Sequence, residues 1–211
     1  MRKKSEVLEI FDILKKAIPH PITELSYVNP YTFLVAVILS AQSTDKGVNK
    51  ATPALFKAAD TPRKMVDLGM DNLKNYIKTI GLYNNKAKNI ILMSQDLVNK
   101  YNGEVPGTRE DLESLAGVGR KTANVFLNVI YDQPVIAVDT HVIRIANRLG
   151  FTESQNPVQI ERDLEAILPE KYRKLANHLL VLFGRYTCKA QKPECETCPI
   201  SKLCHSSDKR I

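Results

Sequence analysis

Two glycines on either side of one apolar residue, Gly117 and Gly119 around Val118, place the tightest constraint on how this chain can fold. The residues before them (108–115) and after them (121–130) both have the spacing of a helix. Glycine lets the backbone turn tightly and approach a ligand closely, because it has no Cβ atom. The pattern therefore predicts two helices joined by a short hairpin.

The start of the second helix in this hairpin is a candidate binding site. The first N–H groups of a helix have no partner within it, and they carry the positive end of the helix dipole. A phosphate is the natural ligand there, so we expect Gly117, Val118, Gly119 and Arg120 to bind a nucleic-acid backbone. Lys121 follows in the first turn, where the dipole disfavours positive charge, and a partly neutral amine is a nucleophile. Locally, Lys121 is either that nucleophile or a further phosphate contact.

The cysteines form a second group at the end of the chain. None precedes residue 188, which favours a metal site over disulfide bonds. Gaps of six, two and five residues separate them, and this spacing suits a tetrahedral zinc and a [4Fe–4S] cluster equally well. Lys189 and Lys192 lie in the first gap, as phosphate contacts or as solvated charges. The four cysteines are Cys188, Cys195, Cys198 and Cys204.

The charge of the chain favours a polyanionic partner. It has 30 Lys and Arg residues against 23 Asp and Glu residues, a formal net charge of +7. The longest apolar run, 33–39, is too short to span a bilayer, and no secretory signal follows the basic start of the chain. We therefore expect no membrane partner and a location in the cytoplasm, associated with the nucleoid.

Apolar spacing and helix caps predict an all-α fold of roughly ten short helices, with no strand pair. Asn29-Pro30 begins an apolar helix that we expect at the centre of a core, and Thr61-Pro62 and Asn156-Pro157 begin others. Segment 134–138 is expected to be extended. Further helices are predicted at about 7–18, 48–56, 71–81, 84–101, 139–149, 157–168 and 171–184.

Several polar residues have an ordinary structural interpretation. Asp139 directly precedes a predicted helix, and capping is its expected local role. Asp45 is a possible cap for the helix near Val48. Residues 84–86, Asn-Asn-Lys, have the composition of an ordinary polar turn.

Taken together, these motifs resemble the endonuclease III family of helix-hairpin-helix DNA glycosylases and abasic-site lyases. The resemblance covers nearly the whole chain, and the order of the motifs makes it specific. One position departs from it, because Ala116 stands where many members have proline. The matching segments are 39–42 with 44–45, 80–84, 103–106, the hairpin with Lys121, 137–141, 184–188 and the cysteine spacing.

The resemblance implies two helical domains with a cleft between them. Residues 23–133 would form a six-helix barrel that contains the helix-hairpin-helix. Residues 1–22 and 134–211 would form an iron–sulfur domain, in which the four cysteines hold a [4Fe–4S] cluster.

The resemblance also implies an activity, the removal of oxidised pyrimidines from damaged double-stranded DNA, followed by cleavage of the abasic site by a monomeric enzyme. Lys121 would be the nucleophile and Asp139 the essential carboxylate. Gln42 and Leu82 would fill the gap that the extruded nucleotide leaves, and Asp45 belongs to the same DNA-binding group.

Other activities compete with this interpretation. A pyrimidine-dimer glycosylase of the same family would share every motif. A non-catalytic helix-hairpin-helix module would need neither the lysine–aspartate pair nor the cluster, and an iron–sulfur electron carrier would not need so basic a chain.

Overall fold

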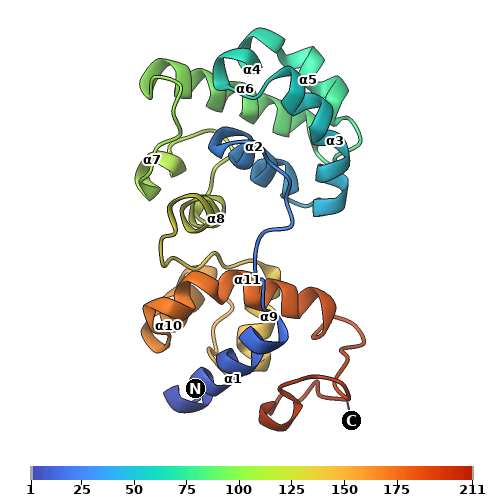
Figure 1. Ribbon diagram of the computed structural model, residues 1–211, viewed down its shortest axis with the longest axis vertical. Coiled ribbons are helices and arrows are strands. Elements are labelled where there is room, and N and C mark those ends of the chain that lie inside the picture. Colours follow the sequence, from blue (N-terminus) through green and yellow to red (C-terminus); the bar gives the residue numbers. More distant parts are fainter. Residues whose placement is uncertain (1, 211) are drawn as a thin grey trace. The chain divides into compact units, whose positions relative to one another are not determined.

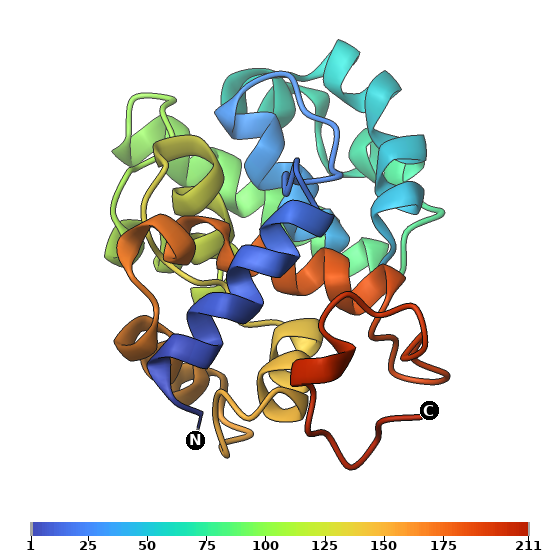
Figure 2. The ribbon, with the colours of Figure 1, turned by 60° about the horizontal axis from the view of Figure 1, so that its bottom comes forward.

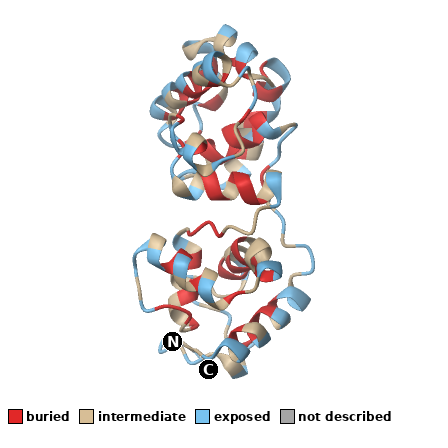
Figure 3. Ribbon diagram, turned by 90° about the vertical axis from the view of Figure 1, so that its left-hand side faces the viewer, coloured by how far each residue is buried: buried red, intermediate tan, exposed pale blue. Residues whose placement is uncertain are grey.

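The computed structural model describes residues 2–210, and all regular structure in this range is helical (Figure 1). The all-α prediction is therefore confirmed. The chain divides into two compact units. We call Glu24–Tyr131 the hairpin unit, and the residues up to Thr23 together with those from Asp132 onward the cysteine unit. Buried residues gather in the interior of each unit (Figure 3).

Helix α2 (Pro30–Ser40) is the centre of the hairpin unit, as its apolar sequence predicts. Its residues 33–39 are at most 3% exposed, because α2 packs against α3, α6 and α8. Asn29 caps it: the Asn29 side chain accepts from the Thr32 amide (2.9 Å), and the Thr32 hydroxyl accepts from the Asn29 amide (2.9 Å). This reciprocal pair satisfies two backbone donors at the half-buried start of the helix.

The other helices of the hairpin unit pack on the three that contact α2. Helices α4 and α5 pack against α6, and α7 packs against α8. Their bounds are α3 (Asp45–Ala58), α4 (Pro62–Leu68), α5 (Met70–Ile77), α6 (Tyr83–Lys100), α7 (Arg109–Glu113) and α8 (Arg120–Tyr131).

The cysteine unit joins the start of the chain to its last third. Helix α1 lies beside α11 (Figures 1 and 2), and Phe11 of α1 packs its ring 5.8 Å from that of Phe151 and 5.6 Å from that of Tyr172. The Arg2 amide donates to the Gly150 carbonyl (3.1 Å), so the chain start is bonded to the same core. The elements are α1 (Lys4–Ala17), α9 (Thr140–Arg148), α10 (Pro157–Ile167), α11 (Glu170–Tyr186) and the short 3₁₀ helix η1 (Ser201–Leu203).

Some local predictions need correction. Helix α5 begins at Met70 rather than Asp71, because Gly69 at a φ of 78° lies between it and α4, and it ends at Ile77 rather than Gly81. The capping of α3 by Asp45 is wrong, since the Thr44 hydroxyl accepts from the Gly47 amide (3.1 Å) and Asp45 is the first helical residue.

Segment 134–138 forms no regular element, although its last three residues are buried. None of the described helices has both the length and the apolar character that a bilayer crossing requires.

The cap of α2 gives a testable contribution to stability. Asn29 also donates from its side-chain nitrogen to the Asp60 carbonyl (2.8 Å). We expect Asn29→Ala to lower the free energy of unfolding by about 1–2 kcal/mol, because it removes the cap and leaves buried backbone groups without partners.

Denaturant unfolding, with amide hydrogen exchange of α2, measures this change. Asn156→Ala is the control in the cysteine unit, where the Asn156 side chain caps the start of α10 by accepting from two backbone amides. It should lower the stability of α10 and leave the exchange of α2 unchanged. Unaltered α2 exchange in Asn29→Ala would contradict the assigned role.

Candidate functional site

The predicted hairpin is present between α7 and α8. The Thr108 hydroxyl caps α7 by accepting from the Asp111 amide (3.2 Å). Leu115 and Val118, which are 3% and 5% exposed, anchor the hairpin in the core, and the Val118 amide donates to the Leu115 carbonyl (3.1 Å). Two buried apolar anchors thus fix the turn between them, so that the start of α8 has a defined position.

The two glycines of the hairpin have different roles. Gly117 has a φ of 80°, and a Cβ atom at this position would lie 2.8 Å from the Asn89 Cβ on α6. Both the backbone conformation and the close packing therefore require glycine. At Gly119, a Cβ would meet no described atom within 4 Å, and the carbonyl accepts from the Ala123 amide (2.9 Å). The absence of a side chain there leaves the backbone at the helix start accessible to a ligand.

Lys121 lies in the first turn of α8, directly after this open backbone. Its side chain is exposed, whereas that of the neighbouring Arg120 is half-buried. A flexible amine thus reaches solvent next to N–H groups that suit a phosphate. The arrangement can hold a nucleic-acid backbone and bring a primary amine to it.

Gln42 and Leu82 both adopt a left-handed backbone conformation, with φ values of 52° and 58°. For residues other than glycine this conformation costs about 1–2 kcal/mol. The two turns are in contact, since a Cβ built at Gly81 would lie 3.6 Å from the Gln42 carbonyl oxygen. Both side chains are exposed, Leu82 by 56%. Strained backbone that displays adjacent side chains to solvent is typical of a functional site.

Lys86 was missed by the sequence analysis, and the polar-turn interpretation of residues 84–86 is wrong. These residues form the first turn of α6, and Lys86 is only 5% exposed. Burial lowers the pKa of its ammonium group. The helical spacing of the sequence could have predicted the burial of Lys86, because Lys86 lies one turn before the buried Ile90 and therefore on the same face of the helix.

Asp139 is the N-cap of α9, as its position predicts. One carboxylate oxygen, Oδ1, accepts from the Val142 amide (2.9 Å), and the residue is half-buried. Burial lowers the pKa of nearby His141, while the Asp139 charge acts in the opposite direction. The cap fixes the orientation of the carboxylate. Asp139 belongs to the cysteine unit and Lys121 to the hairpin unit.

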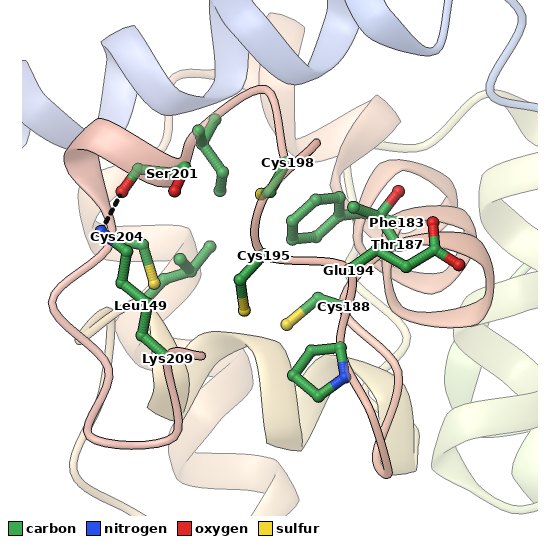
Figure 4. A pocket seen from close by; sticks show the side chains of 12 residues that line it. Leu149, Phe183, Thr187, Cys188, Glu194, Cys195, Cys198, Ser201, Cys204 and Lys209 are labelled. Atoms are coloured by element: carbon green, nitrogen blue, oxygen red, sulfur yellow. Dashed lines mark hydrogen bonds between the residues drawn. The ribbon is translucent and has the colours of Figure 1, made fainter. Parts of the chain in front are cut away.

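The four cysteines come together around one pocket in the cysteine unit (Figure 4). The pocket has an empty volume of about 330 Å³, part of which is open to solvent, and every cysteine is half-buried and free of disulfide bonds. Apolar side chains, among them Leu149 and Phe183, line the rest of it. Within residues 2–210, no three metal-ligating side chains lie close enough together to hold a single metal ion. Four thiols around an apolar pocket fit the donor set of an iron–sulfur cluster.

Two arginines of α9 hold the first cysteine in place. Arg144 donates to the backbone carbonyls of Gly184 (2.9 Å) and Cys188 (3.2 Å). Arg148 donates to the Cys188 sulfur (3.5 Å) and the Lys189 carbonyl (2.7 Å). Burial raises the pKa of the Cys188 thiol, and the contact with Arg148 opposes this change. Second-layer donors of this kind orient a ligand and stabilise its thiolate form. The sequence analysis did not identify either arginine.

The two lysines of the first cysteine gap differ in their surroundings. Lys189 forms an ion pair with Glu194 on the same loop (2.5 Å) and is half-buried. Lys192 is exposed and has a φ of 51°. Lys192 therefore offers its charge to solvent more directly than Lys189 does.

Comparison with known proteins identifies the family. A family model described as "HhH-GPD superfamily base excision DNA repair protein" matches residues 35–170. A second, "Iron-sulfur binding domain of endonuclease III", matches residues 188–204, from the first cysteine to the last. The chain is 53% identical to endonuclease III of Haemophilus influenzae and 50% identical to that of Escherichia coli, in each case over 98% of both chains.

Solved structures agree with these matches. The chain resembles an endonuclease III in a trapped covalent intermediate with DNA, with a TM-score of 0.92, 43% identity and coverage of 97% of both chains. A non-covalent endonuclease III–DNA complex gives the same TM-score and identity, over 97% of this chain and 96% of that one. A thermostable thymine-DNA glycosylase at 23% identity shares the fold, with a TM-score of 0.86. The chain therefore belongs to the endonuclease III family of base-excision DNA repair enzymes, which are bifunctional DNA glycosylases and abasic-site lyases with a [4Fe–4S] cluster.

Proposed function

We propose that this enzyme removes oxidised pyrimidines from double-stranded DNA and then cleaves the strand 3′ to the abasic site through an imine on Lys121. The observation that carries the proposal is an exposed lysine in the first turn of α8, next to an open glycine backbone. A relative that is 43% identical is described as a trapped covalent intermediate with DNA, which supports a nucleophile of this kind. We place the enzyme in the cytoplasm, on the nucleoid.

Binding combines contacts to phosphates with contacts to the damaged site. The backbone N–H groups of Gly117 and Gly119 and the side chain of Arg120 would hold phosphates at the start of α8, whereas the Val118 N–H is used within the turn. Lys189 and Lys192 would hold others. A base within a duplex is out of reach of an amine, so the damaged nucleotide must leave the stack, which costs least where damage has weakened pairing. Gln42 and Leu82 would occupy the gap, with Asp45 nearby in sequence at the start of α3.

The chemical steps use one amine. As the C1′–N bond to the base breaks, the base takes the bonding electrons and C1′ acquires positive charge. The Lys121 nitrogen forms a bond to C1′ and loses a proton, and opening of the sugar ring gives an imine. The imine acidifies the C2′ proton. Loss of that proton is followed by cleavage of the C3′–O bond, so that the 3′ phosphate leaves and the strand is nicked.

Asp139 would stabilise the positive charge at C1′ or accept a proton from Lys121. Its capping bond to Val142 uses only Oδ1, and holds the carboxylate in one orientation. An acid fixed in this way does not need to be ordered when the substrate binds, which favours the reaction.

Cys188, Cys195, Cys198 and Cys204 would hold the [4Fe–4S] cluster, given their placement around one pocket. When bound, the cluster supplies a rigid cross-link for a segment that contains little regular structure. Arg144 and Arg148 orient Cys188 toward it. We further propose that residues 23–133 act as the six-helix barrel domain and that residues 1–22 with 134–211 act as the cluster domain.

The role of Lys121 is tested by borohydride trapping on abasic duplex DNA. We expect Lys121→Ala to abolish the covalent adduct, because no amine remains to form the imine, while binding to the duplex stays within about threefold of the unmodified protein. Lys57→Ala, at an exposed lysine of α3, is the matched control and should be trapped normally. An adduct that persists in Lys121→Ala would refute the assignment.

Asp139 can be tested without losing its cap. Asparagine caps helices as well as aspartate does, so Asp139→Asn should keep the thermal stability while it removes the charge. We expect base excision under single-turnover conditions to slow by about 10²–10⁴-fold. Asp139→Ala should be equally slow and also less stable. If Asp139→Asn retained full activity, the carboxylate would have only its structural role.

The lysines of the cysteine loop are tested by the salt dependence of DNA binding. For Lys192→Ala, we expect the slope of log K against log salt concentration to fall by about 0.9, since one phosphate contact is lost. Lys189→Ala should change the slope less, because Glu194 already neutralises much of that charge. Equal changes of slope for the two variants would show that the ion pair between Lys189 and Glu194 opens in the complex. An unchanged slope for Lys192→Ala would exclude a contact between Lys192 and a phosphate.

A further inference from the structure

The hairpin unit contains a buried ammonium group that the mechanism does not use. Lys86 is 5% exposed, and its Nζ atom donates to the Leu39 carbonyl (2.9 Å) and to the Ser43 hydroxyl (3.0 Å). Both partners are neutral oxygens. Because burial of a charged lysine is unfavourable unless polar groups compensate for it, this residue needs a structural reason.

The compensation comes from the end of α2. A helix end carries unpaired carbonyls and the negative end of the dipole, so it attracts a cation. Leu39 is fully buried, so its carbonyl needs a partner from the protein itself. The last four carbonyls of α2 are all satisfied: Val37 O by Ser40 Oγ (2.8 Å), Ile38 O by the Ala41 amide (3.4 Å), Leu39 O by Lys86 Nζ, and Ser40 O by the Ser43 amide (3.0 Å).

The same lysine connects the two left-handed turns. Its side chain bonds to Leu39 and Ser43, one on each side of Gln42 along the chain. Its backbone amide donates to the Leu82 carbonyl (3.1 Å). Lys86 thus makes contacts to the turn that carries Gln42 and to the turn that carries Leu82.

We propose that Lys86 is a positioning residue that holds Gln42 and Leu82 in the relative arrangement needed to recognise the gap in a damaged duplex. The inference rests on the proposed function of these two side chains. Left-handed conformations of glutamine and leucine persist only where the surroundings enforce them. Without the ammonium, the turn at Gln42 would lose its link to α6 and relax, and the two exposed side chains would no longer be presented together.

The test compares two duplexes, one with a tetrahydrofuran abasic analogue and one undamaged. We expect Lys86→Met, which keeps the length and apolar stem of the side chain, to reduce the preference for the analogue by about tenfold, a coupling typical of contacting residues. Affinity for the undamaged duplex should change by less than about twofold, since phosphate contacts do not depend on Lys86. Lys100→Met, at an exposed lysine of the same helix, should leave both affinities unchanged.

A double-mutant cycle separates positioning from a general loss of structure. In a protein that already carries Gln42→Ala and Leu82→Ala, Lys86→Met should reduce the preference for the analogue by less than about twofold, because the side chains that Lys86 positions are gone. A cost as large as in the unmodified protein would overturn the inference, and so would an unchanged preference in Lys86→Met alone. Ser43→Ala gives a second route if Lys86→Met unfolds: it removes one contact of the ammonium and should lower the preference by about threefold in the unmodified protein only.

Failure of the proposed function has a different signature. If Gln42→Ala, Leu82→Ala retained the full preference, the DNA contact of these residues would be wrong, and the inference about Lys86 would fail with it. The proposed function would stand if Gln42→Ala, Leu82→Ala lost the preference for the analogue and the unmodified protein were trapped by borohydride. If Lys86→Met and Ser43→Ala then kept the full preference, only the inference about Lys86 would be overturned.

Discussion

The hairpin unit depends on enclosing one apolar helix. Residues 33–39 of α2 are buried, and α3, α6 and α8 pack around them. The first and last turns of the helix also contain fully buried residues, Thr32 and Leu39. A buried helix end is stable only when its backbone groups have partners. Asn29 and Thr32 provide hydrogen-bonding partners at the start of α2, and Lys86 provides one at its C-terminal end. The burial of α2 thus requires hydrogen-bonding side chains near both of its ends.

In the cysteine unit, α9 has a comparable organising role. Its N-cap is Asp139, the proposed catalytic acid, and five and nine residues later Arg144 and Arg148 bond to the loop that begins at Cys188. One short helix therefore fixes the carboxylate at one end and the first cysteine at the other. Because the helix is rigid over this length, the cysteine loop and the acid have a fixed geometry with respect to each other. The cluster can accordingly support the site through structure alone, without taking part in the reaction.

The features that the sequence predicts well are those with local causes. Caps at Asn29, Thr61, Asp139 and Asn156 mark helix starts correctly, because a capping side chain bonds within three residues of itself. The hairpin follows from Gly117 in the same way. Asp45 failed as a cap because Thr44 occupies the capping position, and both residue types serve that purpose.

Features with distant partners could not be read from local sequence. Lys86 and Leu39 are 47 residues apart in the sequence, so no local pattern predicts the hydrogen bond between them. Likewise, Arg144 and Arg148 are 44 and 40 residues from Cys188, to which they bond. The roles proposed for Lys121 and Asp139 rest on the family resemblance, since locally each residue has an ordinary alternative. For Asp139 the structure adds that capping and catalysis do not compete, because the cap engages only Oδ1.

Lys86 and Lys121 show why residue type and helix position together do not determine a role. Each lysine lies in the first turn of a helix that follows a turn with left-handed backbone, at Leu82 and Gly117 respectively. Lys86 points into the core, where the end of α2 presents a carbonyl that needs a donor, and it becomes a structural cation. Lys121 lies two residues after Gly119, where an added Cβ would meet no described atom within 4 Å, and its side chain is exposed to solvent. The chemistry of each lysine is therefore set by the element that faces it, and a nucleophile requires a position where no element of the protein occupies its nitrogen.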